Sequence, residues 1–374
     1  MWCSASAQSR LTDSSFASLI TCGQGNDYYL SFGHTAIRVC DPQQGIDHVY
    51  NYGTFDFDSP NLYWNFVRGY LNYCVSVSDY RRFVAVYQYE GRSLAEQRLR
   101  LSPTEVNRLF DALEENCLPE NRYYIYDFFR DNCATRARDI ILGALDNPDI
   151  FAKRTADTNH TYRQMIYRYV DRLQWWQLGV DLLLGMRCDR PVSTFDYMFI
   201  PFDLQNQTDT ALTSAGQPLA DPTVQVLYET KQPNPESLSP TLVFWLLFAA
   251  VAALSVVAYT KQWQLRWLDI PLFALVALLS ILLVVMWFGT IHWCTKWNLN
   301  LLWLNPLFIY IVFRLRKTNR IVLYITLASL AITVIGFAWL PQQFNTAVIP
   351  IALTLAVRLA SYLLPQRNKK KGNI

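Results

Sequence analysis

Two residues that lie far apart in the sequence have the types and settings that thiol-dependent acyl chemistry requires. His34 lies in the segment SFGHTAIRV, residues 31–39, where a turn at a glycine runs into a predicted strand. Cys133 lies in DNCATR, residues 131–136, which has the pattern of a helix start. A cysteine attacks as its thiolate, and a nearby imidazole can accept its proton. We therefore expect Cys133 to act as a nucleophile and His34 as a base.

The predicted helix start favours the thiolate form of Cys133. Unpaired N–H groups and the helix dipole stabilise negative charge there, and Asp131 or Asn132 can cap this helix. Positions 133, 137, 140, 141 and 144 share one helical face, and the last four are Ala, Ile, Ile and Ala. The thiol should therefore project along the buried face, toward a sheet. The backbone N–H of Cys133 can itself form part of an oxyanion hole.

Both residues also have structural interpretations. An exported cysteine is more often half of a disulfide or a small core residue than a nucleophile. A single histidine is likewise usually structural. Cys22, in the segment TCGQG at 21–25, is the rival thiol. No predicted helix follows its glycine-bearing loop, so the helix start ranks Cys133 above Cys22.

The composition excludes several classes of protein. The chain has 374 residues and is 52% hydrophobic, enough for one globular domain plus a membrane region. A net charge of +3 is too small to indicate a nucleic-acid partner. The eight cysteines contain no CxxC pair, and the sequence has no Walker loop, GxGxxG or HExxH motif. We therefore expect no metal and no cofactor.

Five apolar segments follow residue 240 and predict a membrane region. Four of them approach the roughly 20 residues that span a bilayer. The third is shorter and contains Pro306, so we expect it to be kinked. The segments cover residues 241–260, 268–288, 299–313, 321–340 and 346–364.

Basic residues in alternate connections predict the orientation. Loops rich in Lys and Arg stay in the cytoplasm, so the tail should lie inside and the N-terminal domain outside. The expected location is the inner membrane of a bacterium, with several passes. Arg358 falls near the inner end of the last segment, where it can snorkel. The basic connections hold Lys261 and Arg266, then Arg314, Arg316, Lys317 and Arg320, and finally Arg367, Lys369, Lys370 and Lys371.

The first half of the chain predicts an exported α+β domain. The ASA pattern at 5–7 is typical of a cleavage site, so residues 1–7 are predicted to be a signal-peptide remnant. Export would permit disulfides among Cys22, Cys40, Cys74, Cys117 and Cys188. Alternation predicts strands at 35–39, 48–52, 71–78 and 83–90. Helices are predicted from the capping box at 102 to about 116, from 131 or 132 onward, and over 161–187.

These features predict a division of the chain into five parts. They are a signal remnant at 1–7, a catalytic domain at 8–190, a linker at 191–239, a five-helix membrane domain at 240–365 and a basic cytoplasmic tail at 366–374.

The order of the two candidate residues resembles a known arrangement. A histidine on a strand followed by a cysteine at a helix start is similar to permuted papain-like enzymes of the NlpC/P60 or lecithin:retinol acyltransferase type. More closely, the chain resembles the Lnb family of bacterial lipoprotein N-acyltransferases. The resemblance spans both halves of the chain and rests on residues 32–39, 51–57, 68–73, 131–136 and 298–306, the last preceded by His292.

The resemblance implies a fold and a reaction. The fold would be a permuted papain-like exported domain followed by five membrane helices. Cys133 would take an acyl chain from a phospholipid as a thioester, and the α-amine of a diacylglyceryl-cysteine on a lipoprotein would then accept it. His34 would carry protons in both steps. The expected partners are the phospholipid donor, the diacylated lipoprotein acceptor and the membrane.

Several further residues are candidates for the site. His48, Asp56 or Asp131 could orient His34; their structural interpretations are a loop histidine, a turn residue and a helix cap. Arg68 and Arg136 could hold a lipid phosphate, or could simply be solvated charges.

The loop between the second and third apolar segments is the last candidate. His292, Asn298 and Asn300 lie there, and the asparagines are polar groups entering a span, which is costly without partners. We expect this loop to close over the active site or guide an acyl chain. Otherwise His292 is an interfacial residue beside two tryptophans.

Two other functions use the same features. One is a membrane-anchored hydrolase of the same fold, a peptidase or amidase acting on cell wall, for which five spans are excessive as a tether. The other is a non-enzymatic assembly factor that binds lipoproteins, which would tolerate loss of the Cys133 thiol.

Overall fold

The computed structural model describes residues 11–25, 27–54, 61–70, 72–147, 160–193, 195–213, 216–230, 238–315 and 317–364. The chain forms two compact units, which we describe separately. The first comprises Met1–His160 and Pro191–Asn234, and the second comprises Thr161–Arg190 and Pro235–Ile374. The predicted signal remnant at 1–7 and the basic tail at 366–374 lie outside the described residues.

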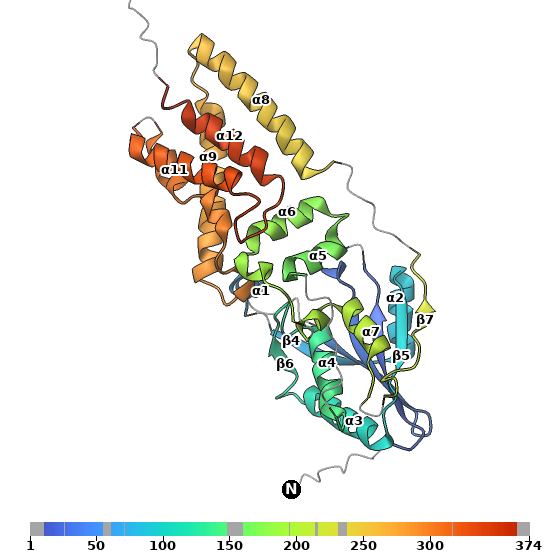
Figure 1. The fold of residues 1–374 in the computed structure, drawn as a ribbon. Helices are drawn as coiled ribbons and strands as arrows, with labels where there is room; N and C mark the ends of the chain where they lie inside the picture. The colour runs from blue at the N-terminus through green and yellow to red at the C-terminus, as the bar shows by residue number, and fades with distance from the viewer. Residues whose placement is uncertain are drawn as a thin grey trace, which may run out of the picture. The chain divides into compact units, whose positions relative to one another are not determined.

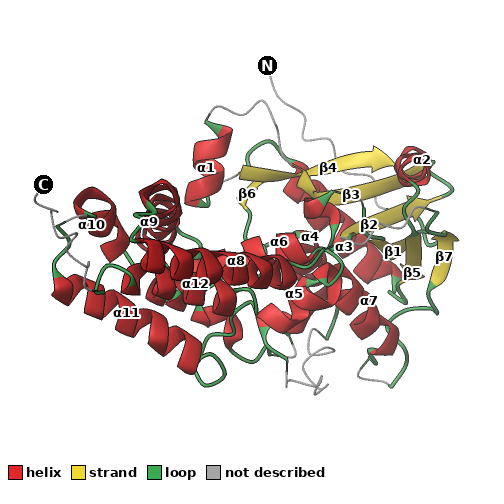
Figure 2. Cartoon of the chain, turned by 90° about the horizontal axis from the view of Figure 1, so that it is seen from above, coloured by secondary structure: helices red, strands yellow, loops and turns green. Residues whose placement is uncertain are grey.

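The first unit is built on one seven-stranded antiparallel sheet, drawn in yellow in Figure 2. Its strand order is β6-β4-β3-β2-β1-β5-β7, so the four strands β4, β3, β2 and β1 are sheet neighbours. Three of the predicted strands correspond to β2, β3 and β4. The strands are β1 (Phe16–Cys22), β2 (His34–Asp41), β3 (Ile46–Thr54), β4 (Asn72–Asp79), β5 (Leu94–Arg98), β6 (Tyr123–Ile125) and β7 (Val224–Leu227).

Helices cover both faces of this sheet, as Figure 1 shows for α2, α3 and α4. Helix α3 (Pro103–Cys117) and helix α4 (Cys133–Ala144) pack on the main core, together with α7 (Pro201–Thr210). Helix α2 (Tyr80–Glu90) packs on the opposite face of the sheet, where it forms a smaller core. A short helix, α1 (Leu62–Arg68), precedes β4. Ser102 and Glu105 form the predicted capping box of α3.

The prediction of a strand over 83–90 is wrong, because this segment belongs to α2. Asp79 caps the helix by accepting hydrogen bonds from the N–H groups of Arg81 and Arg82. Gly91 ends it at a positive φ of 71°. Phe83 and Tyr87, four positions apart, are the buried residues of this helix.

The segment predicted to be a linker also has a different structure. The described residues between 191 and 230 belong to the first unit, where they supply α7 and the edge strand β7. The carbonyl of Phe199 accepts a hydrogen bond from the side chain of Asn132, 2.8 Å away. Pro201 lies in the first turn of α7, a position where proline favours the start of a helix.

The second unit contains the apolar helices. Helices α8 (Pro240–Lys261) and α9 (Arg266–Phe288) are long and apolar enough to cross a membrane. Helices α11 (Arg320–Ile335) and α12 (Val348–Ala360) are apolar but shorter, and α10 (Leu307–Arg314) is shorter still. Pro306 immediately precedes α10, so the third predicted span is helical only in its second half, after the short 3-10 turn η6 (Leu299–Leu302).

The same unit includes a segment that the sequence assigned to the exported domain. Residues 161–187 form two helices, α5 (Tyr162–Val170) and α6 (Gln174–Leu183), followed by the 3-10 turn η3 (Met186–Asp189). Contacts group them with the apolar helices. Within this unit Arg163 is fully buried and forms ion pairs with Asp181 at 3.0 Å and Asp189 at 2.7 Å.

Arg358 does not snorkel as predicted. Its side chain is 4% exposed, and its guanidinium binds both carboxylate oxygens of Asp269 in α9, at 2.7 and 2.9 Å. Ser255 of α8 accepts a further hydrogen bond from Arg358, and Tyr362 donates one to Asp269. A charge away from the water interface is tolerated when it is paired. The pair therefore ties α12 to α9 and α8.

We predict that Asp269→Asn lowers the free energy of unfolding by about 3–5 kcal/mol, because it leaves the Arg358 charge buried and unpaired. The measurement is thermal unfolding of the purified protein in detergent. The matched control is the double variant Asp269→Leu with Arg358→Leu, which removes both charges and should recover most of the loss. An unfolding temperature for Asp269→Asn equal to that of the wild type would contradict this role.

Candidate active site

Cys133 is the first residue of α4, as the sequence predicted. The cap is Asn132 rather than Asp131. Its side-chain oxygen accepts hydrogen bonds from the N–H groups of Ala134 and Thr135, both at 2.9 Å. The Thr135 hydroxyl in turn accepts one from the N–H of Asn132. This capping box fixes the direction of the first turn and holds the Cys133 thiol beside the end of the sheet.

His34 is the first residue of β2 and follows Gly33, whose φ of +72° favours glycine. The strand pairs with β1, where Cys22 lies opposite His34. The Nε2–H of His34 donates a hydrogen bond to the side-chain oxygen of Asn51 in β3. The other ring nitrogen, Nδ1, is then free to bond with Cys133, to which His34 is also hydrogen bonded. The three side chains form a Cys–His–Asn arrangement.

Gly53 opens the space beside this pair. It lies at a bulge between β3 and β4 and has a φ of +96°. A Cβ atom at this position would lie 3.7 Å from Cε1 of His34 and 3.8 Å from Cβ of Cys133. The absent side chain therefore leaves the imidazole and the thiol uncovered at this point.

The electrostatics of the pair favour a thiolate and an imidazolium. Burial opposes the charged form of Cys133, but the charge of His34 and its hydrogen bond outweigh this and lower the pKa of the thiol. The N–H groups of Thr35 and Ala134 add to this effect. Burial likewise acts against the charge on His34, yet the thiolate and the bond to Asn51 raise the pKa of the imidazole. These are the shifts that activate a cysteine nucleophile.

Cys22 has the opposite environment. It is fully buried, and burial raises the pKa of its thiol to about 12. At neutral pH it is therefore a neutral core residue. The cysteines at which a disulfide was permitted, Cys22, Cys40, Cys74, Cys117 and Cys188, all carry free thiols in the structure, as do Cys133 and Cys294.

Aromatic rings lie beside the Cys133 thiol. Tyr73 and Tyr126 stack with their ring centroids 4.3 Å apart, and Tyr124 lies 6.4 Å from Tyr73. Burial raises the pKa of Tyr73 to about 12, and the charge on Cys133 contributes to the rise. These rings present apolar surface next to the thiol, and such a surface suits a hydrocarbon chain.

The side chain that contacts the His34 ring is Asn51, which is not among the candidates predicted from the sequence. His48 pairs with Val39, five residues along β2 from His34, which is roughly 16 Å at the rise of a strand. Asp131 instead forms an ion pair with Arg136, at 2.5 and 2.8 Å. Asp56, the third candidate, lies outside the described residues. The sequence signal for Asn51 would have been its place on the strand next to β2.

The two candidate phosphate ligands differ in their surroundings. Arg136 is neutralised by Asp131, and its guanidinium lies over the ring of Tyr124 at 3.7 Å. Arg68 is exposed at the end of α1, with its guanidinium 5.1 Å from the Tyr70 ring. Of the two, Arg68 has the more accessible charge.

The loop candidates belong to the second unit. His292 is half-buried and precedes the 3-10 turn η5 (Trp293–Thr295). Asn298 and Asn300 are buried, and their side-chain amides donate to the carbonyls of Asp181, Leu182 and Leu183 in α6. The predicted need of these asparagines for partners is therefore met by α6, and neither amide is free to face solvent.

An antiparallel sheet with a Cys–His–Asn arrangement, in a chain with apolar helices long enough to cross a bilayer, defines a membrane protein with a thiol site. Two family models agree with this class. One, described as the Lnb N-terminal periplasmic domain, matches residues 5–169, and the other, the Lnb transmembrane domain, matches residues 232–370. The chain therefore belongs to the Lnb family, which confirms the resemblance seen in the sequence. Searches of curated proteins and of solved structures found no match.

Proposed function

We propose that the protein is a lipoprotein N-acyltransferase. It would move an acyl chain from a phospholipid, through a thioester on Cys133, to the α-amine of a diacylglyceryl-cysteine. The observation that carries the proposal is the placement of Cys133 at the start of α4, beside the imidazole of His34. This site lies in a periplasmic domain that is joined to a transmembrane domain. Both substrates are anchored in the bilayer, so a membrane enzyme meets them by lateral diffusion.

The first half-reaction would form the acyl-enzyme. The Cys133 thiolate attacks the ester carbonyl of the phospholipid, and the carbonyl oxygen becomes negatively charged. The N–H of Cys133, at the first position of α4, has no partner within the helix and can stabilise this oxygen. The ester bond then breaks, and the imidazolium of His34 gives its proton to the departing lysophospholipid oxygen.

The second half-reaction would return the thiolate. The neutral α-amine of the acceptor attacks the thioester carbonyl, and Nδ1 of His34 takes the proton that the amine loses. The C–S bond breaks, which leaves an amide on the lipoprotein and the thiolate–imidazolium pair on the enzyme. Asn51 holds the ring throughout by accepting from its Nε2–H. The rings of Tyr73, Tyr124 and Tyr126 would lie along the acyl chain.

The remaining features of the proposal concern topology. Under this proposal the basic connections lie in the cytoplasm, so the C-terminal tail is cytoplasmic and five segments span the inner membrane. The exposed guanidinium of Arg68 would bind the donor phosphate.

The reaction can be tested with purified protein in detergent. Phospholipid and a synthetic diacylglyceryl-cysteine peptide are supplied, and the products are identified by mass. We expect one acyl chain on the peptide amine and an equal amount of lysophospholipid. Release of free fatty acid with an unmodified peptide would indicate a hydrolase instead, and no change in either substrate would favour an assembly factor.

We predict that Asn51→Ala lowers kcat by up to about 100-fold, because the His34 ring loses its fixed orientation. KM for the lipopeptide should change little, since Asn51 acts through His34 rather than on the substrate. The measurement is steady-state kinetics with the same lipopeptide. Asn51→Gln, which keeps an amide oxygen, serves as the conservative variant and should recover part of the rate. A rise in KM of similar size, with kcat unchanged, would contradict this positioning role.

A further inference from the structure

Two cysteines in the second unit lie on loops that pack backbone against backbone. Cys188 is in η3 and Cys294 is in η5. The Cys188 thiol lies 3.6 Å from the carbonyl oxygen of Cys294. That same carbonyl accepts a hydrogen bond from the N–H of Gly185 at 2.8 Å. Hydrogen bonds therefore connect the two loops at these residues.

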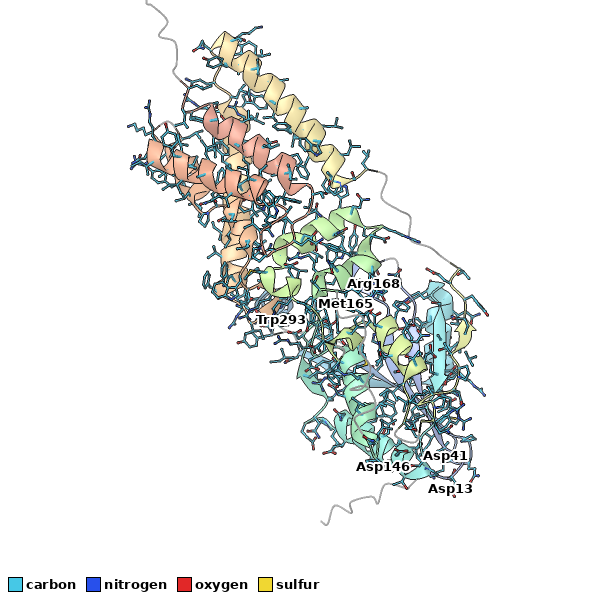
Figure 3. All side chains as sticks on the ribbon, viewed as in Figure 1. Asp13, Asp41, Asp146, Met165, Arg168 and Trp293 are labelled. Atoms are coloured by element: carbon cyan, nitrogen blue, oxygen red, sulfur yellow. The ribbon has the colours of Figure 1, made fainter. Side chains whose placement is uncertain are left out.

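Gly185 permits this close approach. A Cβ atom at this position would lie 2.1 Å from the carbonyl oxygen of Lys296. A second backbone hydrogen bond runs from Met186 to Trp297 at 3.1 Å. Trp293, labelled in Figure 3, packs edge-on to Tyr162 of α5 with 5.4 Å between ring centroids. The segment that carries Cys294 is thus held against the segment that carries Cys188 by contacts on both sides of the thiols.

The two thiols differ in exposure. Cys188 is fully buried, while Cys294 is partly exposed. The exposed member of the pair can be reached by another protein. Under the proposed topology both loops lie on the periplasmic side, where disulfides form and persist.

We propose that Cys188 and Cys294 are joined by a disulfide in the exported protein. Both S–H bonds break and one S–S bond forms, and two electrons and two protons pass to the disulfide of an exported thiol–disulfide oxidoreductase, which becomes a dithiol. The bond closes a long loop that includes α8 and α9. A cross-link restricts the unfolded chain more when the loop that it closes is longer. This inference rests on the proposed topology, but it is independent of the chemistry at Cys133.

The test is thiol labelling of the full-length protein in membranes from cells that export it. The membranes are quenched with acid, unfolded in denaturant and treated with a maleimide before and after reduction, and the labelled peptides are mapped by mass. We expect Cys188 and Cys294 to react only after reduction, and we expect their two peptides to be found joined before it. Maleimide on Cys294 in the unreduced wild type, to the extent seen after reduction, would overturn the proposal.

Matched variants separate pairing from other causes of protection. In Cys188→Ser, Cys294 should react without reduction, and in Cys294→Ser the same should hold for Cys188. Either variant alone is sufficient if the other does not accumulate. Cys117→Ser, at a partly exposed thiol of the first unit, should leave Cys294 protected as in the wild type. Cys133→Ser should also keep the cross-link, so a failure of acyl transfer and a failure of this proposal give different results.

Discussion

Replacement of Cys133 by serine will abolish N-acylation of a lipopeptide, with a loss in kcat of at least about a thousandfold. The serine hydroxyl has a much higher pKa than the thiol, so the charge of His34 and the N–H groups of Thr35 and Ala134 cannot make it an anion at neutral pH. The measurement is the initial rate of amine acylation, with the melting temperature recorded to show that the variant is folded.

Cys22→Ala is the control for this result, because Cys22 is the thiol that lies opposite His34 on the neighbouring strand. Its pKa of about 12 leaves it neutral, so its removal should cost some stability but keep acylation. If Cys22→Ala abolishes transfer in a folded protein while Cys133→Ser retains it, the assignment of the nucleophile is wrong.

Replacement of His34 by alanine will lower kcat by about 10²–10⁴-fold, which is the range for removing a general acid and base. It will also change the titration of Cys133. Without the imidazolium, burial is the largest remaining influence on the thiol, and burial raises its pKa. The rate of alkylation of Cys133 by iodoacetamide, measured against pH, should therefore move to higher pH in His34→Ala.

The wild-type profile follows from the same two shifts. The pKa of Cys133 is lowered and that of His34 is raised, and both shifts favour the thiolate–imidazolium pair. Acylation of the enzyme falls as the pH drops through the thiol pKa, because the nucleophile is protonated. It also falls as the pH rises through the imidazolium pKa, because the proton for the leaving group is lost. His48→Ala, at a histidine remote from Cys133, should keep the wild-type profile. An alkylation profile for His34→Ala identical to that of the wild type would contradict the pairing.

The elements that carry the site could be predicted because their signals are local. A cap residue before Cys133 and the alternation after Gly33 are sufficient to predict the start of α4 and of β2. The error at α2 was also local. Alternation over 83–90 predicts a strand, although Asp79 and Gly91 are the cap residues of a helix of this length.

Asn51 could not be predicted from local signals. Its contact with His34 depends on the register between β2 and β3 and on the bulge at Gly53, which are set by the whole sheet. The sequence instead favoured residues of the types that commonly orient a histidine, among them His48 and Asp131.

The buried polar residues of the second unit show the same limit. The sequence indicated that Asn298 and Asn300 need partners, but their partners are backbone carbonyls of α6, more than a hundred residues away. Arg358 falls near the inner end of the last apolar segment, and this position predicts a side chain that reaches water. Asp269, its partner, lies in a different helix. Long-range pairs of this kind require the tertiary structure.

The most direct test of the account is the intact mass of the purified protein after incubation with phospholipid alone. The wild type should gain the mass of one fatty-acyl chain, and hydroxylamine should remove it, as expected for a thioester. Cys133→Ser should gain no hydroxylamine-labile acyl chain, because none of its remaining cysteines forms the thioester. A wild-type protein that gains no acyl mass, yet still acylates the lipopeptide amine when the acceptor is added, would contradict the thioester on Cys133.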